Sequence, residues 1–290
     1  MNDEHVENHI IPKYHTVITS EHKFLRLNLK EGWQYRDLIW LFTKRNFQVT
    51  YKQTVLGPAW LFINPILSSL IYCFIFGGIA NMGTDGIPQM LFYLSGNAIW
   101  TLFSNCLQKN ATTFTANAGT FGKVYFPRLT VPISNVLSAI ITFGIQMIMT
   151  LIFLVVYLIK GAVSPNWALW PLIPLLLVWL GVMGMGLGII ISSMTTKYRD
   201  LTVLVGFGVQ LWMYITPVVY PLSQTDNPTL RTLLQINPVT SPVEIFRYAL
   251  LGQGTINPYY VIWSIAFTVI VAVVGIMIFN KVEKTFMDTV

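Results

Sequence analysis

The stretch "KYRDLTVLVGFGVQLWMYITPVVYP", residues 197–221, decides the fold class of this sequence. It opens with Lys197, Arg199 and Asp200 and then stays apolar until the break at Thr216-Pro217. About 20 apolar residues are needed to cross the hydrocarbon core of a bilayer as a helix. The stretch therefore predicts a membrane helix with a charged cluster at one end and a proline-broken, aromatic segment at the other.

The composition of the whole chain supports a membrane protein. Of its 290 residues, 54% are hydrophobic and only 10% are charged, whereas about a quarter are charged in a soluble domain. The net charge of +6 lies mostly beside apolar runs, as it does in cytoplasmic loops, and no basic face with interleaved aromatics suggests nucleic acid. All four histidines fall in the first 22 residues, where we expect a solvated tail and no metal site.

Hydropathy predicts an all-α integral membrane protein with six transmembrane helices. They run over residues 60–80, 90–107, 131–159, 168–194, 201–220 and 259–279. With the N-terminus inside, ten inner Lys and Arg residues face three outer ones, Lys160, Arg231 and Arg247; the inner ones are Lys44, Arg45, Lys52, Lys109, Lys123, Arg128, Lys197, Arg199, Lys281 and Lys284. This bias predicts that both termini are cytoplasmic.

Two segments add to the six spans. After a polar tail (residues 1–30), residues 31–56 predict an amphipathic helix whose cations separate two apolar stripes, formed by Trp33, Trp40, Phe47 and Tyr51 and by Leu38, Phe42 and Val49. Such a helix suits the inner membrane surface or packing on a partner. The rest of the chain, residues 57–290, forms the membrane domain.

The second added segment lies outside, between the fifth and sixth spans. Asn227-Pro228 and Ser241-Pro242 each place an N-cap before a proline, Ser241 and Glu244 form a capping box, and Gly252 supplies a stop. Two short helices result, within residues 227–252, and they are too short to span and too apolar for water. We expect a re-entrant pair, with Thr216-Pro217 loosening the fifth span where it meets them.

The chemistry of an enzyme or an ion-coupled carrier is missing. Between Gln53 and Asn280 the carboxylates are Asp85, Asp200, Asp226 and Glu244, each in a loop or at a helix end. Coupled carriers and membrane enzymes need titratable groups or metal clusters within the membrane or at one face. "GTFGKVYF" (119–126) lacks the spacing of a phosphate-binding loop. We expect no catalytic residue, metal or cofactor in this chain.

Small residues in the fourth span predict close helix packing. Gly181, Gly184, Gly186 and Gly188 give a G-x-x-x-G spacing, which suits contacts within the subunit or across a dimer. Cys73 and Cys106 lie in apolar runs without a C-x-x-C motif, so we expect packing residues.

Four stretches together resemble the membrane subunit, or permease, of type-2 ATP-binding-cassette polysaccharide exporters. They are "TVLGPAWLFINPIL", "FGKVYFPRLTVPISNVLS", the 197–221 stretch and "INPVTSPVEIFRYALLGQG". The resemblance implies a homodimer in the bacterial inner membrane, with ATP and Mg bound by a separate ATPase subunit. A coupling helix at about 116–127 would dock on that ATPase through Thr120, Phe121, Gly122, Lys123, Val124, Tyr125 and Phe126.

The cargo implied is a polysaccharide of O-antigen type on a polyprenyl pyrophosphate lipid. Lys44, Arg45 and Lys52 are candidates for the pyrophosphate head group. Aromatic rings let sugars slide, so channel-lining candidates are Trp100, Phe103, Trp212, Tyr214 and Tyr220; an interfacial aromatic belt explains them equally well. Alternatives are a capsule or teichoic acid exporter, a drug or lipid exporter of the same architecture, and a passive channel or scaffold protein.

Overall fold

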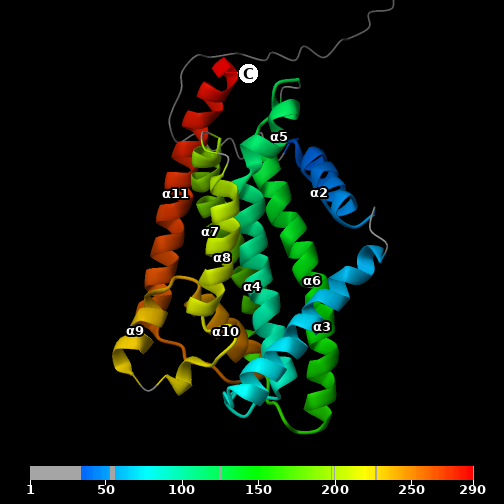
Figure 1. Cartoon of the computed structure of the whole chain (residues 1–290), viewed down its shortest axis with the longest axis vertical. Helices are drawn as coiled ribbons and strands as arrows, with labels where there is room; N and C mark the ends of the chain where they lie inside the picture. Colours follow the sequence, from blue (N-terminus) through cyan, green and yellow to red (C-terminus); the bar gives the residue numbers. More distant parts are fainter. Residues whose placement is uncertain are drawn as a thin grey trace, which may run out of the picture.

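The computed structural model describes residues 34–52, 56–123, 126–196, 198, 200–225 and 227–289, and every regular element in these ranges is helical. Figure 1 shows α4, α6, α7, α8 and α11 running along the length of the molecule. The helices α2 and α5 lie at the same end as the C-terminus, and α9 and α10 lie at the opposite end. This arrangement agrees with the predicted all-α class.

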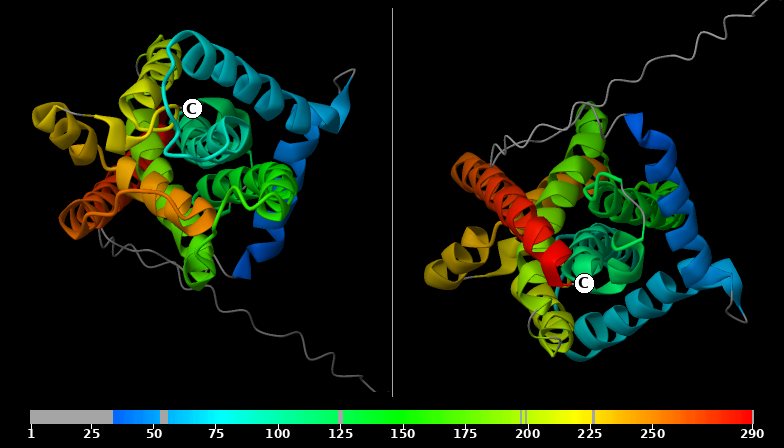
Figure 2. Two further views of the ribbon diagram at one scale, coloured as in Figure 1. Left: turned by 90° about the horizontal axis from the view of Figure 1, so that it is seen from below. Right: turned by 90° about the horizontal axis from the view of Figure 1, so that it is seen from above.

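The helices have the following bounds in chain order. They are α2 (Arg36–Tyr51), η1 (Gly57–Ala59), α3 (Trp60–Tyr72), the π-helical η2 (Cys73–Ile79), α4 (Gln89–Ala111), α5 (Thr113–Phe121), α6 (Thr130–Ile159), η3 (Trp167–Leu172), α7 (Ile173–Thr195), α8 (Leu201–Ile215), η4 (Leu222–Gln224), α9 (Pro228–Ile236), α10 (Thr240–Leu251) and α11 (Pro258–Thr289). Seen end-on, α2 and α3 lie along two adjoining sides of the bundle (Figure 2).

In the part of the chain that the structure describes, four helical stretches are long and apolar enough to cross a membrane: 57–79, 130–159, 167–195 and 258–282. They correspond to the first, third, fourth and sixth predicted spans. The predicted second span, α4, has 23 residues but a more polar composition, and most of its residues are buried. The predicted fifth span, α8, is apolar and has only 15 residues. Six spans therefore stay a prediction.

The glycines of α7 allow its backbone to approach two neighbouring helices. A Cβ on Gly188 would lie 2.5 Å from the Leu107 carbonyl oxygen of α4, and one on Gly184 would lie 2.7 Å from Cβ of Cys106. On another side, a Cβ on Gly186 would lie 2.9 Å from Val271 of α11. The glycine series thus serves packing within the subunit, which decides between the two predicted alternatives.

The helix α2 packs one side against α6 and leaves the other exposed. Phe42 is buried and contacts Phe126, with ring centroids 5.5 Å apart, and Thr43 Oγ1 donates a hydrogen bond to the Ser134 carbonyl at 3.4 Å. Trp40 and Val49 are 60% and 72% exposed. The predicted stripe of Leu38, Phe42 and Val49 is therefore divided between the packed and the exposed side. Trp33 lies outside the described residues.

The two helices predicted at the outer end are present as α9 and α10. The Asn227 side chain accepts hydrogen bonds from the N–H groups of Thr229 and Leu230, so this N-cap is confirmed. The predicted stop is also confirmed, because Gly252 has φ 75° in the left-handed region. The predicted capping box is wrong: α10 already begins at Thr240, and no side chain caps it.

Candidate functional site

Lys44 and Arg45 lie on α2 and Lys52 directly follows its last residue; all three candidate head-group cations are exposed to solvent. The Arg45 guanidinium lies 4.8 Å from the centre of the Phe42 ring and donates from Nη2 to Asn117 Oδ1 on α5 at 3.3 Å. Lys44 and Lys52 are separated by about two helical turns, with Lys52 at the C-terminal end of α2. The fold thus presents three positive side chains at the end of the bundle that holds α5 and the C-terminus.

The predicted coupling segment combines α5 with the turn that follows it. Gly122 and Lys123 are exposed and Thr120 is half-buried. Phe121 and Phe126 are buried, with ring centroids 5.8 Å apart, in a second apolar core. These two rings stabilise the turn from inside and have no surface to offer to a partner. Val124 and Tyr125 lie outside the described residues.

Three of the five candidate channel aromatics form one packed cluster inside the subunit. Trp100 and Phe103 are 5% and 0% exposed, and their ring centroids are 5.5 Å apart. The half-buried Trp212 contacts Phe103 edge-on at 5.4 Å. A channel wall must expose its side chains, so Trp100 and Phe103 are core residues here.

The other two aromatics remain accessible. Tyr214 is 47% exposed on α8, and the half-buried Tyr220 donates a hydrogen bond from its hydroxyl to the Tyr214 carbonyl at 3.1 Å. This contact folds the segment after α8 back onto its last turn. Tyr214 is the candidate aromatic with the most surface available to a cargo.

The segment at Thr216-Pro217, where α8 ends, is fixed by hydrogen bonds, contrary to the predicted loosening. The helix ends at Ile215, and the buried Thr216 is extended with φ −96° and ψ 138°. Asn237, between α9 and α10, donates to Thr216 Oγ1 at 2.8 Å and accepts from Trp212 Nε1 at 3.1 Å. Proline ends the helix here, and the asparagine fixes its direction.

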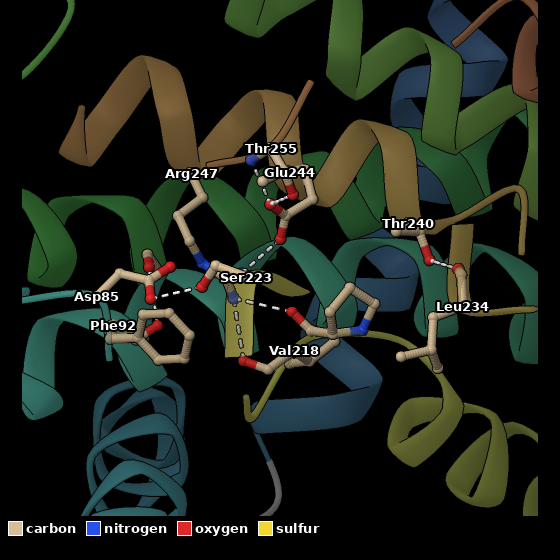
Figure 3. A network of polar contacts seen from close by, with 11 residues as sticks. Asp85, Phe92, Val218, Ser223, Leu234, Thr240, Glu244, Arg247 and Thr255 are labelled. Carbon is tan, nitrogen blue, oxygen red and sulfur yellow. Dashed lines mark hydrogen bonds and ion pairs between the residues drawn. The ribbon is translucent and has the colours of Figure 1, made fainter. Parts of the chain in front are cut away.

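A buried ion pair lies next to the end of α8 (Figure 3). Arg247 and Glu244, both on α10, are 3% exposed, and Arg247 Nη1 donates to Glu244 Oε1 at 2.8 Å. The other arm of Arg247, Nη2, donates to the carbonyls of Pro217 and Val218 at 3.0 and 3.2 Å. The Arg247 side chain thus joins α10 to the segment that follows α8.

The remaining contacts of the pair reach two more parts of the chain. Glu244 Oε2 accepts from the N–H of Thr255 at 2.8 Å and from its hydroxyl at 3.1 Å, which ties α10 to the segment before α11. The Arg247 guanidinium also stacks 4.0 Å above the Phe92 ring of α4. The Glu244–Arg247 ion pair was not predicted from the sequence, although the i, i+3 spacing of opposite charges on a helix is a recognised pairing signal.

An open depression of about 460 Å³ lies beside the Glu244–Arg247 ion pair, between α9 and the start of α11. Its lining is Arg231, Gln235, Thr255, Ile256, Asn257 and Pro258. A guanidinium, two amides and a hydroxyl can all hydrogen-bond to sugar hydroxyls. Within the described ranges, no group of three or more His, Cys, Asp or Glu side chains is placed to hold a metal ion.

Comparison with known proteins identifies the family. Residues 37–251, which run from α2 to the end of α10, match the ABC-2 type transporter family. The chain belongs to the ABC-2 type transporter family. An ABC-2 membrane subunit is a transport component, and ATP hydrolysis resides in a separate subunit.

Relatives of the chain are named as permeases and polysaccharide transport proteins. An O-antigen export system permease protein RfbA from Klebsiella pneumoniae is 31% identical over 253 residues, which cover 87% of this chain and 94% of the relative. A protein of the same name from Myxococcus xanthus is 27% identical and covers 73% and 80% of the two chains. The polysialic acid transport protein KpsM of Escherichia coli is 22% identical over 84% and 93%.

Proposed function

We propose that this ABC-2 subunit belongs to an ATP-driven exporter that moves a lipid-linked polysaccharide of O-antigen type across the bacterial inner membrane. The observation that carries the proposal is its similarity, over nearly the full length of both chains, to permeases named for O-antigen export. The lipid anchor proposed is polyprenyl pyrophosphate. ATP and Mg bind to the partner ATPase, and this chain carries neither.

The proposed topology has six spans with both termini in the cytoplasm. The helices α4 and α8 join the four long apolar helices as the second and fifth spans. Most of α4 is buried by neighbouring helices, so its composition need not match lipid. The end of the bundle that holds α2 and α5 faces the cytoplasm, and α9 and α10 form the re-entrant pair at the outer face.

The working unit proposed is a homodimer in which α8 contacts its counterpart. With 15 residues α8 is about 22 Å long, which is shorter than the ~30 Å hydrocarbon core. A Cβ added to Gly206 or Gly208 of α8 would meet nothing within 4 Å, and Val203 and Phe207 are 77% and 61% exposed. Exposed glycines on an apolar helix suit close approach of a second helix.

Each proposed role rests on groups that are exposed or half-buried. The ATPase docks on α2 and on the α5 turn at Thr120, Gly122 and Lys123. Lys44, Arg45 and Lys52 attract the pyrophosphate, because guanidinium and ammonium groups bind phosphate oxygens. Tyr214 and Tyr220 are the aromatics proposed to contact the polymer at the outer end of α8.

Deletion of the gene, followed by measurement of polymer inside and outside the cell, tests the proposal. We expect loss of the surface polymer and accumulation of lipid-linked polymer in the cytoplasm. Accumulated polymer on a phospholipid anchor would favour capsule export, which the similarity to the polysialic acid transporter supports as the second candidate. Unchanged surface polymer with altered sensitivity to small toxic compounds would refute polysaccharide export.

A further inference from the structure

A chain of side-chain hydrogen bonds leads from α2 into the bundle. Asn46 of α2 donates from Nδ2 to Asn135 Oδ1 of α6 at 3.0 Å. Asn135 in turn donates to Asn110 Oδ1 of α4 at 3.2 Å. Three asparagines on three helices are therefore joined in sequence at the end of the bundle that carries α5.

The chain continues through α5 and returns to α2. Thr113, in the first turn of α5, donates to Asn110 Oδ1 at 3.4 Å, and Asn117 Nδ2 donates to the Thr113 carbonyl at 2.9 Å. Arg45, the neighbour of Asn46 on α2, donates to Asn117 Oδ1 at 3.3 Å. The contacts thus form a closed ring over four helices, here named the asparagine ring (Arg45, Asn46, Asn110, Thr113, Asn117 and Asn135).

The inner half of the asparagine ring is buried. Asn110, Thr113 and Asn135 are 0%, 1% and 7% exposed. Asn110 Nδ2 also donates to the Cys106 carbonyl at 2.7 Å, so both ends of this buried amide have partners. Apolar side chains would pack such a junction equally well. Directed hydrogen bonds additionally fix how the helices lie relative to one another.

The start of α5 is also attached to α7. The N–H of Phe114 donates to Ser192 Oγ at 3.3 Å, and Thr195 Oγ1 donates to the Ala111 carbonyl at 2.9 Å. A displacement of α5 must therefore carry the ends of α4 and α7 with it. Through the asparagine ring the same displacement reaches α2 and α6.

We propose that the asparagine ring makes α2 and α5 one rigid docking body, with Asn110 and Asn135 as positioning residues that pass the movement of the ATPase to α4 and α6. The inference rests on the proposed function, in which both helices contact that ATPase. If α2 and α5 contacted the ATPase separately, one helix could move without the other. Because the closed ring joins them, each cycle of hydrolysis displaces α2 and α5 together.

The test uses the complete complex with its ATPase and measures polymer exported per ATP hydrolysed. Asn46→Ala and Asn135→Ala are compared with the variant that carries both substitutions. We expect Asn46→Ala, which removes one hydrogen bond of the ring, to lower the ratio about fivefold. Asn135→Ala removes the bonds to both Asn46 and Asn110 and should lower the ratio at least as much. The double variant should be no worse than Asn135→Ala alone, because that substitution already opens the ring. Effects that multiply, or an unchanged ratio, would overturn the proposal.

Thr142→Val is the matched control on α6. Thr142 is buried and donates to the Ser138 carbonyl at 3.0 Å, so the substitution removes a buried hydrogen bond that stays within one helix. We expect the export ratio of this variant to equal that of the wild type. A loss as large as that of Asn135→Ala would show that weakening α6 anywhere suffices, which would overturn the role of the asparagine ring.

A covalent link in place of the hydrogen bond gives a second readout. In a background with Cys73→Ala and Cys106→Ala, the pair Asn46→Cys and Asn135→Cys should lower the export ratio when its thiols are free. Bridging the thiols with a short bifunctional reagent should restore the ratio, and failure to restore it in the bridged complex would contradict the proposal. If the wild-type complex exports no polymer, the cargo assignment fails instead.

Discussion

Replacing Arg247 by methionine should destabilise the protein more than any surface substitution does. The change keeps much of the side-chain volume but removes the positive charge from a buried pair with Glu244. It also deprives the carbonyls of Pro217 and Val218 of their donor. Removing one partner of a buried ion pair costs about 3–5 kcal/mol, because the remaining charge stays buried without compensation.

The magnitude follows from what remains around Glu244. Its Oε2 keeps the two bonds from Thr255, whereas Oε1 loses the Arg247 donor at 2.8 Å. Because the pair is 3% exposed on both sides, water cannot replace the lost partner without opening α10. We therefore expect the free energy of unfolding to fall by about 3–5 kcal/mol.

Equilibrium unfolding of the purified protein in detergent micelles measures this change. Arg231→Met on α9 removes a half-buried arginine of the same end and should stay within about 0.5 kcal/mol of the wild type. The double variant Glu244→Leu and Arg247→Met removes both charges and should be more stable than Arg247→Met alone. A single variant that loses less than about 1 kcal/mol, or a double variant less stable than the single, would refute a buried, mutually compensating pair.

Three further substitutions test other parts of the structure. Gly188→Ala should lower the free energy of unfolding by about 1–3 kcal/mol, because the new Cβ meets the backbone of α4. Gly206→Ala on the open face of α8 should leave the stability of the protomer unchanged. Unfolding in detergent compares the two variants. Asn237→Leu should cost about 1–3 kcal/mol in the same assay, since it leaves the indole N–H of Trp212 without its acceptor and the buried Thr216 hydroxyl without its donor. Lys44→Gln with Lys52→Gln should lower export at constant ATP hydrolysis, and the loss should shrink at high salt, as measured by transport in membrane vesicles.

Helix positions could be predicted for long apolar segments and for helices whose ends carry a recognisable capping residue. The long apolar runs predicted α3, α6, α7 and α11, and Asn227 and Gly252 marked the ends of α9 and α10. Hydropathy measures preference for lipid, so it describes α4 poorly, since most residues of that helix contact protein. The helix α2 was predicted from its mixture of apolar and basic residues, but which of its apolar residues pack on α6 depends on tertiary contacts.

The candidate site was less predictable, because burial changes the meaning of a residue. Trp100 and Phe103 are residue types that suit a channel wall, yet they form a packed cluster with Trp212 inside the subunit. Asn46, Asn110 and Asn135 lie far apart in the sequence, and no local pattern relates them. Their ring exists only because α2, α4 and α6 meet at one end of the bundle.

The buried carboxylate bears directly on the mechanism. In the part of the chain that the structure describes, Glu244 is the carboxylate with a buried side chain. A coupled carrier needs such a group free to exchange a proton or an ion. Both oxygens of Glu244 are already occupied, one by Arg247 and the other by Thr255. The pair therefore serves to attach α10 to its neighbours, and in the ABC-2 family ATP hydrolysis resides in a separate subunit.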